Sequence, residues 1–140
     1  MACEENFAMK RRLAICKIVL SMPFAVIGFW AWGWSAFCWA GGPDGRIGSP
    51  ESVLYGSAFG LAALVCAFLF VLLNEQKRWA LLSIGLIYGA ILLLMALALT
   101  FAAFRAESGT PLLPQLWAAF AFWVASIAAG YGLFRLARKP

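Results

Sequence analysis

Apolar residues occur in four long runs that short polar segments separate. The runs cover residues 13–40, 51–73, 80–104 and 115–134, and each has 20 residues or more. An α-helix of about 20 apolar residues crosses the hydrocarbon core of a bilayer. The pattern therefore predicts four membrane-spanning helices.

The segments between the runs are too short to form domains. Residues 41–50, GGPDGRIGSP, contain glycines and prolines that cannot continue a helix. Pro50 suits the first turn of the second helix, with Ser49 or Ser52 as its N-cap. Residues 74–79 form a short polar turn, so we expect the second and third helices to be antiparallel neighbours. The sequence thus predicts an all-α, four-helix up-and-down bundle with short loops, one transmembrane domain over residues 1–140.

Basic residues orient this bundle. Nine of the eleven Lys and Arg residues belong to the N-terminal segment, the 74–79 turn and the C-terminal segment, whereas the other two loops hold only Arg46 and Arg105. Cytoplasmic segments of membrane proteins carry the excess of Lys and Arg. We therefore expect a multi-pass protein of the cell's inner membrane with both termini in the cytoplasm. The first run is longer than the apolar core of a signal peptide, so we expect an uncleaved span.

Composition supports the same placement. Of 140 residues, 64% are hydrophobic and 12% are charged, whereas apolar residues make up about half of a soluble domain. The net charge of +5 lies mostly at the ends of the spans, where it indicates topology and not nucleic-acid binding.

No Asp, Glu or His occupies the middle of a span. The chain has no histidine, and its cysteines have no CxxC or metal-ligand spacing. The acids fall in the tail, in loops or at helix ends, at Glu4, Glu5, Asp44, Glu51, Glu75 and Glu107. Proton-coupled carriers ordinarily retain an acid inside the membrane, and the hydroxyls here lack a base that could activate them. We therefore expect no catalytic residues, no metal site and no cofactor.

Four of the seven tryptophans lie in residues 29–39, FWAWGWSAFCW. At about 100° per residue, Trp30 and Trp34 share one face of a helix, and Trp32 and Trp39 share a nearly opposite face. One interpretation is an aromatic belt at the outer membrane interface. The alternative is that one face stacks on a flat hydrophobic ligand, such as a quinone, carotenoid or lipid tail, or contacts a larger partner.

Small residues recur at about four-residue spacing in the last three helices. They form candidate packing stripes, with Gly56 and Gly60 in the second helix, Gly85 and Gly89 in the third, and Ala125 and Gly132 in the fourth. Membrane helices approach closely along such stripes. The stripes indicate packing within one chain, or an interface with a second copy or another subunit.

Basic residues at the cytoplasmic side are candidates for contacts with anionic lipid headgroups. They are Arg11, Arg12, Lys17, Lys77 and Arg78. Lys17 lies inside the first run, where its stem can extend to the interface; the alternatives are a lipid phosphate or an ion pair.

Two functional hypotheses follow. The first is a non-enzymatic accessory, assembly or structural subunit of a larger membrane complex, in contact with membrane lipids and with other subunits or a second copy. The second is a small homo-oligomeric channel or carrier for an uncharged or lipid-like solute, with a path lined by hydroxyl groups.

Overall fold

The computed structural model describes residues 2–43, 45–104 and 112–138. These residues form four helices, α1 (Ala2–Trp39), α2 (Pro50–Leu73), α3 (Lys77–Phe104) and α4 (Leu112–Arg138). All four are long and apolar enough to cross a membrane. Asp44, Arg105, Glu107 and Lys139 lie outside the described residues, as do the side chains of Cys3, Glu4 and Glu5.

The helices extend beyond the predicted spans because backbone hydrogen bonding, not hydropathy, decides where a helix ends. α1 begins at Ala2, well before residue 13, and continues through Pro23. α4 begins at Leu112 and contains Pro114 in its first turn, where a proline removes a donor that has no partner in the helix anyway.

Glycines and a serine define the turn between α1 and α2. The Gly42 N–H donates to Phe37 O at 3.0 Å and the Gly41 N–H to Cys38 O at 3.1 Å, which is the Schellman pattern of a helix C-terminus. Gly41 has a φ of 116°, a left-handed conformation that favours glycine. At the start of α2, the N-cap is Ser49, and its hydroxyl accepts the Ser52 N–H at 3.2 Å.

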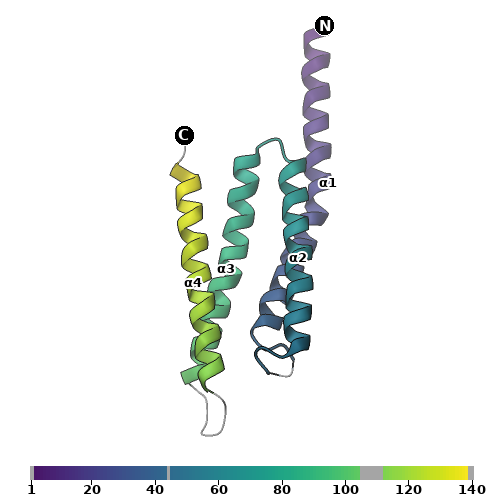
Figure 1. Ribbon diagram of the computed structural model, residues 1–140. Coiled ribbons are helices and arrows are strands. Elements are labelled where there is room, and N and C mark those ends of the chain that lie inside the picture. Colours follow the sequence, from purple (N-terminus) through teal and green to yellow (C-terminus); the bar gives the residue numbers. More distant parts are fainter. Residues whose placement is uncertain (1, 44, 105–111, 139–140) are drawn as a thin grey trace.

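The helices associate in two pairs. α1 packs along α2 and α3 packs along α4, and α3 also contacts both α1 and α2 (Figure 1). α4 packs mainly on α3. The second and third helices are therefore in contact as expected, but the four helices form an open array and not a ring in which each has two close neighbours.

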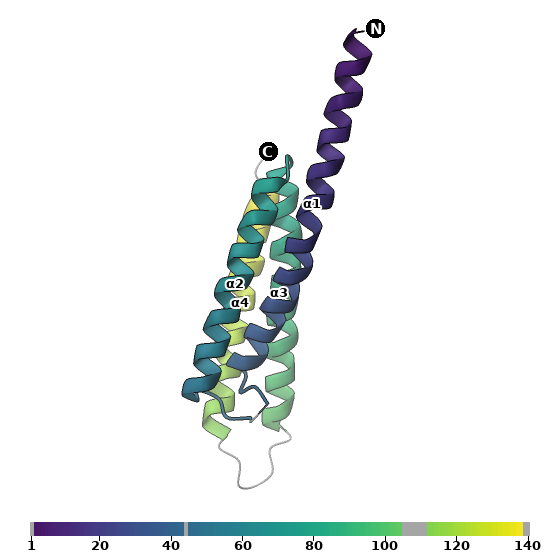
Figure 2. The ribbon, with the colours of Figure 1, turned by 90° about the vertical axis from the view of Figure 1, so that its right-hand side faces the viewer.

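The start of α1 and the end of α4 lie toward one end of the molecule, and the α1–α2 turn lies toward the other (Figure 1). The first turns of α1 extend past the other three helices (Figure 2). This extension contains the basic residues that precede the first apolar run.

Small side chains fill the contacts between helices. Among the described residues, the buried ones are Ser21, Gly28, Ala31, Ser35, Ala36, Cys38, Gly41, Ser52, Gly56, Ala63, Ala80, Ala96, Leu99, Ala103 and Ala119. Only 6–11% of the residues in the most apolar stretch of each helix are buried. Most large apolar side chains therefore face outward, which suits a protein surrounded by lipid or by other membrane subunits.

Candidate functional site

The two tryptophan faces of α1 have different surroundings. The Trp32 ring stacks on the Tyr88 ring of α3, with centroids 4.9 Å apart and planes 9° from parallel. The Trp32 indole N–H donates to Tyr88 O at 3.1 Å, and the Tyr88 hydroxyl donates to Ala63 O on α2 at 3.0 Å. Trp32 and Tyr88 therefore join three helices inside the protein.

Gly28 makes this junction possible. A Cβ at Gly28 would lie 2.7 Å from the Tyr88 hydroxyl and 3.1 Å from Cys66 Cβ. Such distances do not accommodate a side chain unless the Tyr88 ring or the neighbouring backbone moves. Gly28 was not among the residues predicted from the sequence. Small residues recur in α1 at a seven-residue spacing, at Ser21, Gly28 and Ser35. This spacing is typical of the left-handed helix crossings that are common in membrane bundles, and it could have identified Gly28.

Trp39 and Ser35 lie against the glycine stripe of α2. A Cβ at Gly56 would be 2.8 Å from Trp39 Cδ1, and one at Gly60 would be 3.0 Å from Ser35 Oγ. The Ser35 hydroxyl donates to Gly56 O at 2.7 Å. Gly56 and Gly60 therefore both face α1.

The candidate packing residues on α3 and α4 are not all in the contact between these two helices. A Cβ at Gly85 would be 2.5 Å from Leu133 Cδ2, and one at Gly89 would be 3.8 Å from Ala129 Cβ. Ala125 is partly buried, whereas Gly132 is exposed and a Cβ there would meet no described atom within 4 Å. α4 thus contacts the α3 glycines through Ala129 and Leu133, on a stripe beside Gly132.

The other tryptophan face is open. Trp30 is 62% exposed and Trp34 is 46% exposed. Both line a groove of about 400 Å³ with Phe29, Phe37 and Ile91. Apolar rings form nearly all of this surface, so the groove suits an apolar side chain, lipid tail or flat ligand.

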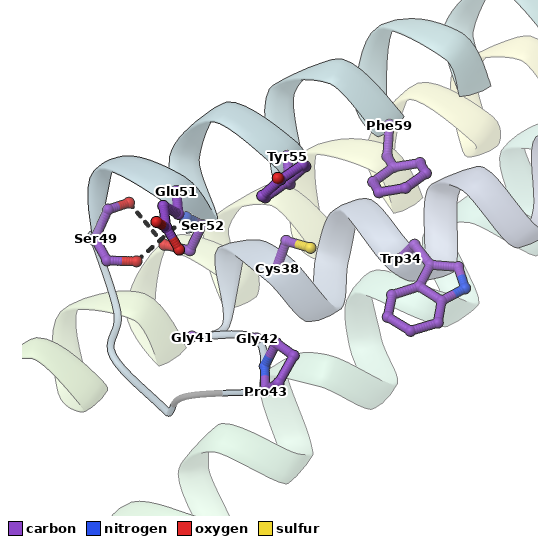
Figure 3. Close-up of a pocket in the computed structure, with 10 residues that line it drawn as sticks. All are labelled: Trp34, Cys38, Gly41, Gly42, Pro43, Ser49, Glu51, Ser52, Tyr55 and Phe59. Carbon is purple, nitrogen blue, oxygen red and sulfur yellow. Dashed lines mark hydrogen bonds between the residues drawn. The ribbon is translucent and has the colours of Figure 1, made fainter.

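A second hollow, of about 310 Å³, shares Trp34 with this groove and lies between α1 and α2 near their connecting turn. Figure 3 shows its two ends: Ser49, Glu51 and Ser52 at the start of α2, and the rings of Trp34 and Phe59 farther along the helices. The centroids of these two rings are 6.3 Å apart. The hollow therefore has a polar end and an aromatic end.

Two of the basic candidates have partners within the chain. Lys17 Nζ lies 3.0 Å from Glu75 Oε1. Of the roles considered for Lys17, this contact corresponds to the ion pair. The Arg78 guanidinium donates to Ala137 O at 2.7 Å and so caps the C-terminal end of α4. Arg11, Arg12 and Lys77 are exposed.

The hydroxyl groups of the spans donate mainly to the backbone. Ser83, Thr100 and Ser126 each donate to the carbonyl four residues earlier, at 2.7 Å. Cys16, Cys38 and Cys66 are free thiols. Over the part of the chain that the structure describes, no three His, Cys, Asp or Glu side chains gather as a metal site would require.

Comparison of this chain with protein-family models, with curated proteins and with solved structures finds no match. Its residues and their geometry are therefore the basis on which a function is assigned.

Proposed function

We propose that this chain is a non-enzymatic accessory, assembly or structural subunit of a larger membrane complex, and that a partner subunit packs on the α1 face formed by Trp30 and Trp34. The observation that carries the proposal is the indole N–H of Trp30. It makes no hydrogen bond with the described part of the chain, although Trp30 lies well inside the first span.

The depth of Trp30 follows from helix geometry. Trp30 precedes the end of α1 at Trp39 by nine residues, which corresponds to about 13 Å along a helix. If Trp39 lies at the membrane interface, Trp30 is near the middle of a hydrocarbon core about 30 Å thick. Tryptophans of an aromatic belt sit at the interface, where water and headgroups accept their N–H. Trp34 and Trp39 suit a belt better than Trp30 does.

Trp32 provides the internal comparison. It lies at nearly the same depth as Trp30, and its N–H is satisfied by Tyr88 O. A polar group without a partner in an apolar medium costs about 1–3 kcal/mol in proteins. A partner subunit that offers a carbonyl or hydroxyl to Trp30 would remove this cost.

The open array supports the same function. α4 packs mainly on α3, and most large apolar side chains of the spans are exposed. In the part of the chain that the structure describes, the helices hold most of the residues, so their exposed apolar faces are the main surface that this part offers to a partner.

We further propose that the chain forms an up-and-down bundle in the cell membrane with both termini in the cytoplasm. The nine-to-two distribution of basic residues supports this orientation, as does the position of the first and last helix ends toward one end of the molecule. A reporter that is active only outside the cytoplasm, fused after Pro140, should stay silent. A strong signal would reverse the orientation.

The subunit proposal is tested by extraction from native membranes in mild detergent, followed by native mass measurement. Comigration with unrelated subunits is the expected result, and the double variant Trp30→Ala/Trp34→Ala should abolish it. Trp117→Ala is the matched control, because Trp117 is 65% exposed on α4, away from the groove. A chain found alone, or loss of partners in the control only, would contradict the proposal.

A homo-oligomer is the outcome that would favour the alternative, a channel or carrier for an uncharged or lipid-like solute. Among the hydroxyls that could line such a path, Ser83, Thr100 and Ser126 donate to carbonyls of their own helices, which makes them less available to a solute. The accessory function therefore has the better support.

A further inference from the structure

A separate pocket lies at the other end of the bundle, where α1 extends past its neighbours and the α2–α3 turn lies beside it (Figure 2). Its volume is about 300 Å³. Lys17, Asn74 and Glu75 form polar parts of the wall, and Ile18, Phe70 and Trp79 form apolar parts. A lining that contains both charged and apolar side chains suits an amphiphile better than a soluble ion.

The charged groups of this pocket have unused bonding capacity. The Lys17–Glu75 contact of 3.0 Å engages one carboxylate oxygen, and an ammonium group has three donors. Their side chains are 50% and 61% exposed, so a ligand can reach both. The two amide hydrogens of Asn74 are directed to Ser21 Oγ at 3.2 Å and Phe70 O at 2.8 Å. This leaves its amide oxygen as an acceptor.

One cation and one carboxylate make the charged lining of the pocket neutral. An anionic lipid would meet Glu75 as well as Lys17, and repulsion from the carboxylate would offset the attraction to the ammonium. A lipid that carries both a phosphate and an ammonium group places a charge of opposite sign beside each residue. The nearby cations Lys77 and Arg78 do not line the pocket, and the Arg78 guanidinium is directed to Ala137 O at the end of α4.

We propose that this pocket binds a zwitterionic phospholipid with a primary ammonium headgroup, phosphatidylethanolamine. Its phosphate accepts from Lys17, its ammonium donates to Glu75 and the Asn74 oxygen, and an acyl chain follows Ile18 and Phe70. A choline headgroup has no N–H to donate, and Trp79 alone does not form the aromatic cage that quaternary ammonium groups require. The inference requires only that the chain crosses a membrane, and it is independent of the partner proposed for Trp30 and Trp34.

The test is native mass spectrometry of the purified full chain in mild detergent, titrated with three phospholipids of identical acyl chains. These carry ethanolamine, choline or glycerol headgroups. We expect ethanolamine lipid to bind about three- to fivefold more tightly than the other two, the size expected for exposed charge pairs. Equal binding of the three, or preference for the anionic glycerol lipid, would overturn the proposal. Equal binding of ethanolamine and choline lipids would also overturn it.

Variants distinguish the charge balance from general lipid adhesion. Glu75→Gln leaves Lys17 unopposed, so the preference should reverse in favour of the glycerol lipid. Glu51→Gln, a carboxylate at the opposite end of the bundle, is the matched control and should leave the preference unchanged. The double variant Lys17→Glu/Glu75→Lys keeps a neutral pair and should keep the preference for ethanolamine lipid even if single variants unfold. A swapped variant that prefers glycerol lipid, or an unchanged preference in folded Glu75→Gln, would overturn the proposal.

Discussion

The pairs α1/α2 and α3/α4 carry similar glycine motifs but use them differently. In α1/α2, the close approach lets the Ser35 hydroxyl donate to Gly56 O, and the Ser21 hydroxyl accept from Asn74. In α3/α4, Gly85 accommodates the end of the Leu133 side chain. Among the described residues, the side-chain hydrogen bond that joins these two helices well inside the pair runs from the Trp123 N–H to Thr100 Oγ1, at 3.1 Å.

A GxxxG motif therefore specifies that a neighbouring helix approaches closely, but not which side chain of that helix contacts the glycines. Where a hydroxyl meets a backbone carbonyl, the helices are fixed in register by a hydrogen bond. Where a leucine meets a glycine, the flexible end of the side chain can move. We therefore expect α1/α2, together with the Trp32–Tyr88 junction, to be less tolerant of substitution than α3/α4.

The largest effect is expected for Gly28→Leu. The new side chain would collide with the Tyr88 hydroxyl and Cys66 Cβ, so α1, α2 and α3 could not all keep their positions. We expect a loss of at least about 3 kcal/mol in the free energy of unfolding, measured by denaturant titration in detergent. Gly33→Leu is the control on the same helix, because a Cβ at Gly33 would meet no described atom within 4 Å. Equal destabilisation by both variants would contradict the role of Gly28.

Substitution of the two glycine motifs compares the pairs directly. Gly56→Leu should destabilise by about 2–3 kcal/mol, because Trp39 and the Ser35 bond must both move. Gly85→Leu should cost less, about 1–2 kcal/mol, since Leu133 can change its conformation. Gly132→Leu is the control and should leave the thermal midpoint nearly unchanged. A greater loss for Gly85→Leu than for Gly56→Leu would reverse the comparison.

Removal of single hydrogen bonds should have smaller effects. Tyr88→Phe keeps a ring to stack on Trp32 but loses the bond to Ala63 O. Thr100→Val removes the acceptor of Trp123 in the other pair. We expect each to lower the free energy of unfolding by about 0.6 kcal/mol and by no more than about 1.7 kcal/mol, the average and the maximum for such bonds inside a membrane protein. Thermal scans of both variants in the same detergent would measure this loss. If neither variant changed the thermal midpoint, these hydrogen bonds would not contribute to the difference between the two helix pairs.

The smallest effect is expected for Arg78→Gln at the start of α3. Its bond to Ala137 O is exposed, so water can replace it. The expected loss is below about 1 kcal/mol, with hydrogen exchange of the last turn of α4 as the more sensitive measurement. An effect as large as that of Gly56→Leu would mean that α3/α4 depends on this contact.

Local features of the fold could be predicted from sequence. Four apolar runs identified the four helices, and Pro50, with Ser49 or Ser52 as the expected N-cap, located the start of α2, because hydropathy and capping depend on neighbouring residues. Helix ends were less predictable: α1 continues to Ala2 through polar residues that hydropathy alone assigns to water.

The site depended on contacts between distant residues. Helical geometry separated Trp30 and Trp34 from Trp32 and Trp39, but only Tyr88, on another helix, decides that Trp32 faces inward. Gly28 was not predicted because the predicted packing stripes have a four-residue spacing in the last three helices. In α1 the small residues recur at a seven-residue spacing instead. Gly132 was included with Ala125, yet α4 meets the α3 glycines through Ala129 and Leu133.

The Trp32–Tyr88 junction has a consequence for biosynthesis. Trp32 leaves the ribosome long before Tyr88, so for the interval in which only α1 and α2 have been made, an indole donor inside the membrane lacks the carbonyl that later accepts it. We expect the insertion machinery to retain the first two helices until the third is synthesised. Crosslinking of arrested chains that end before residue 77 should therefore capture α1 beside that machinery, and chains that extend beyond α3 should be released.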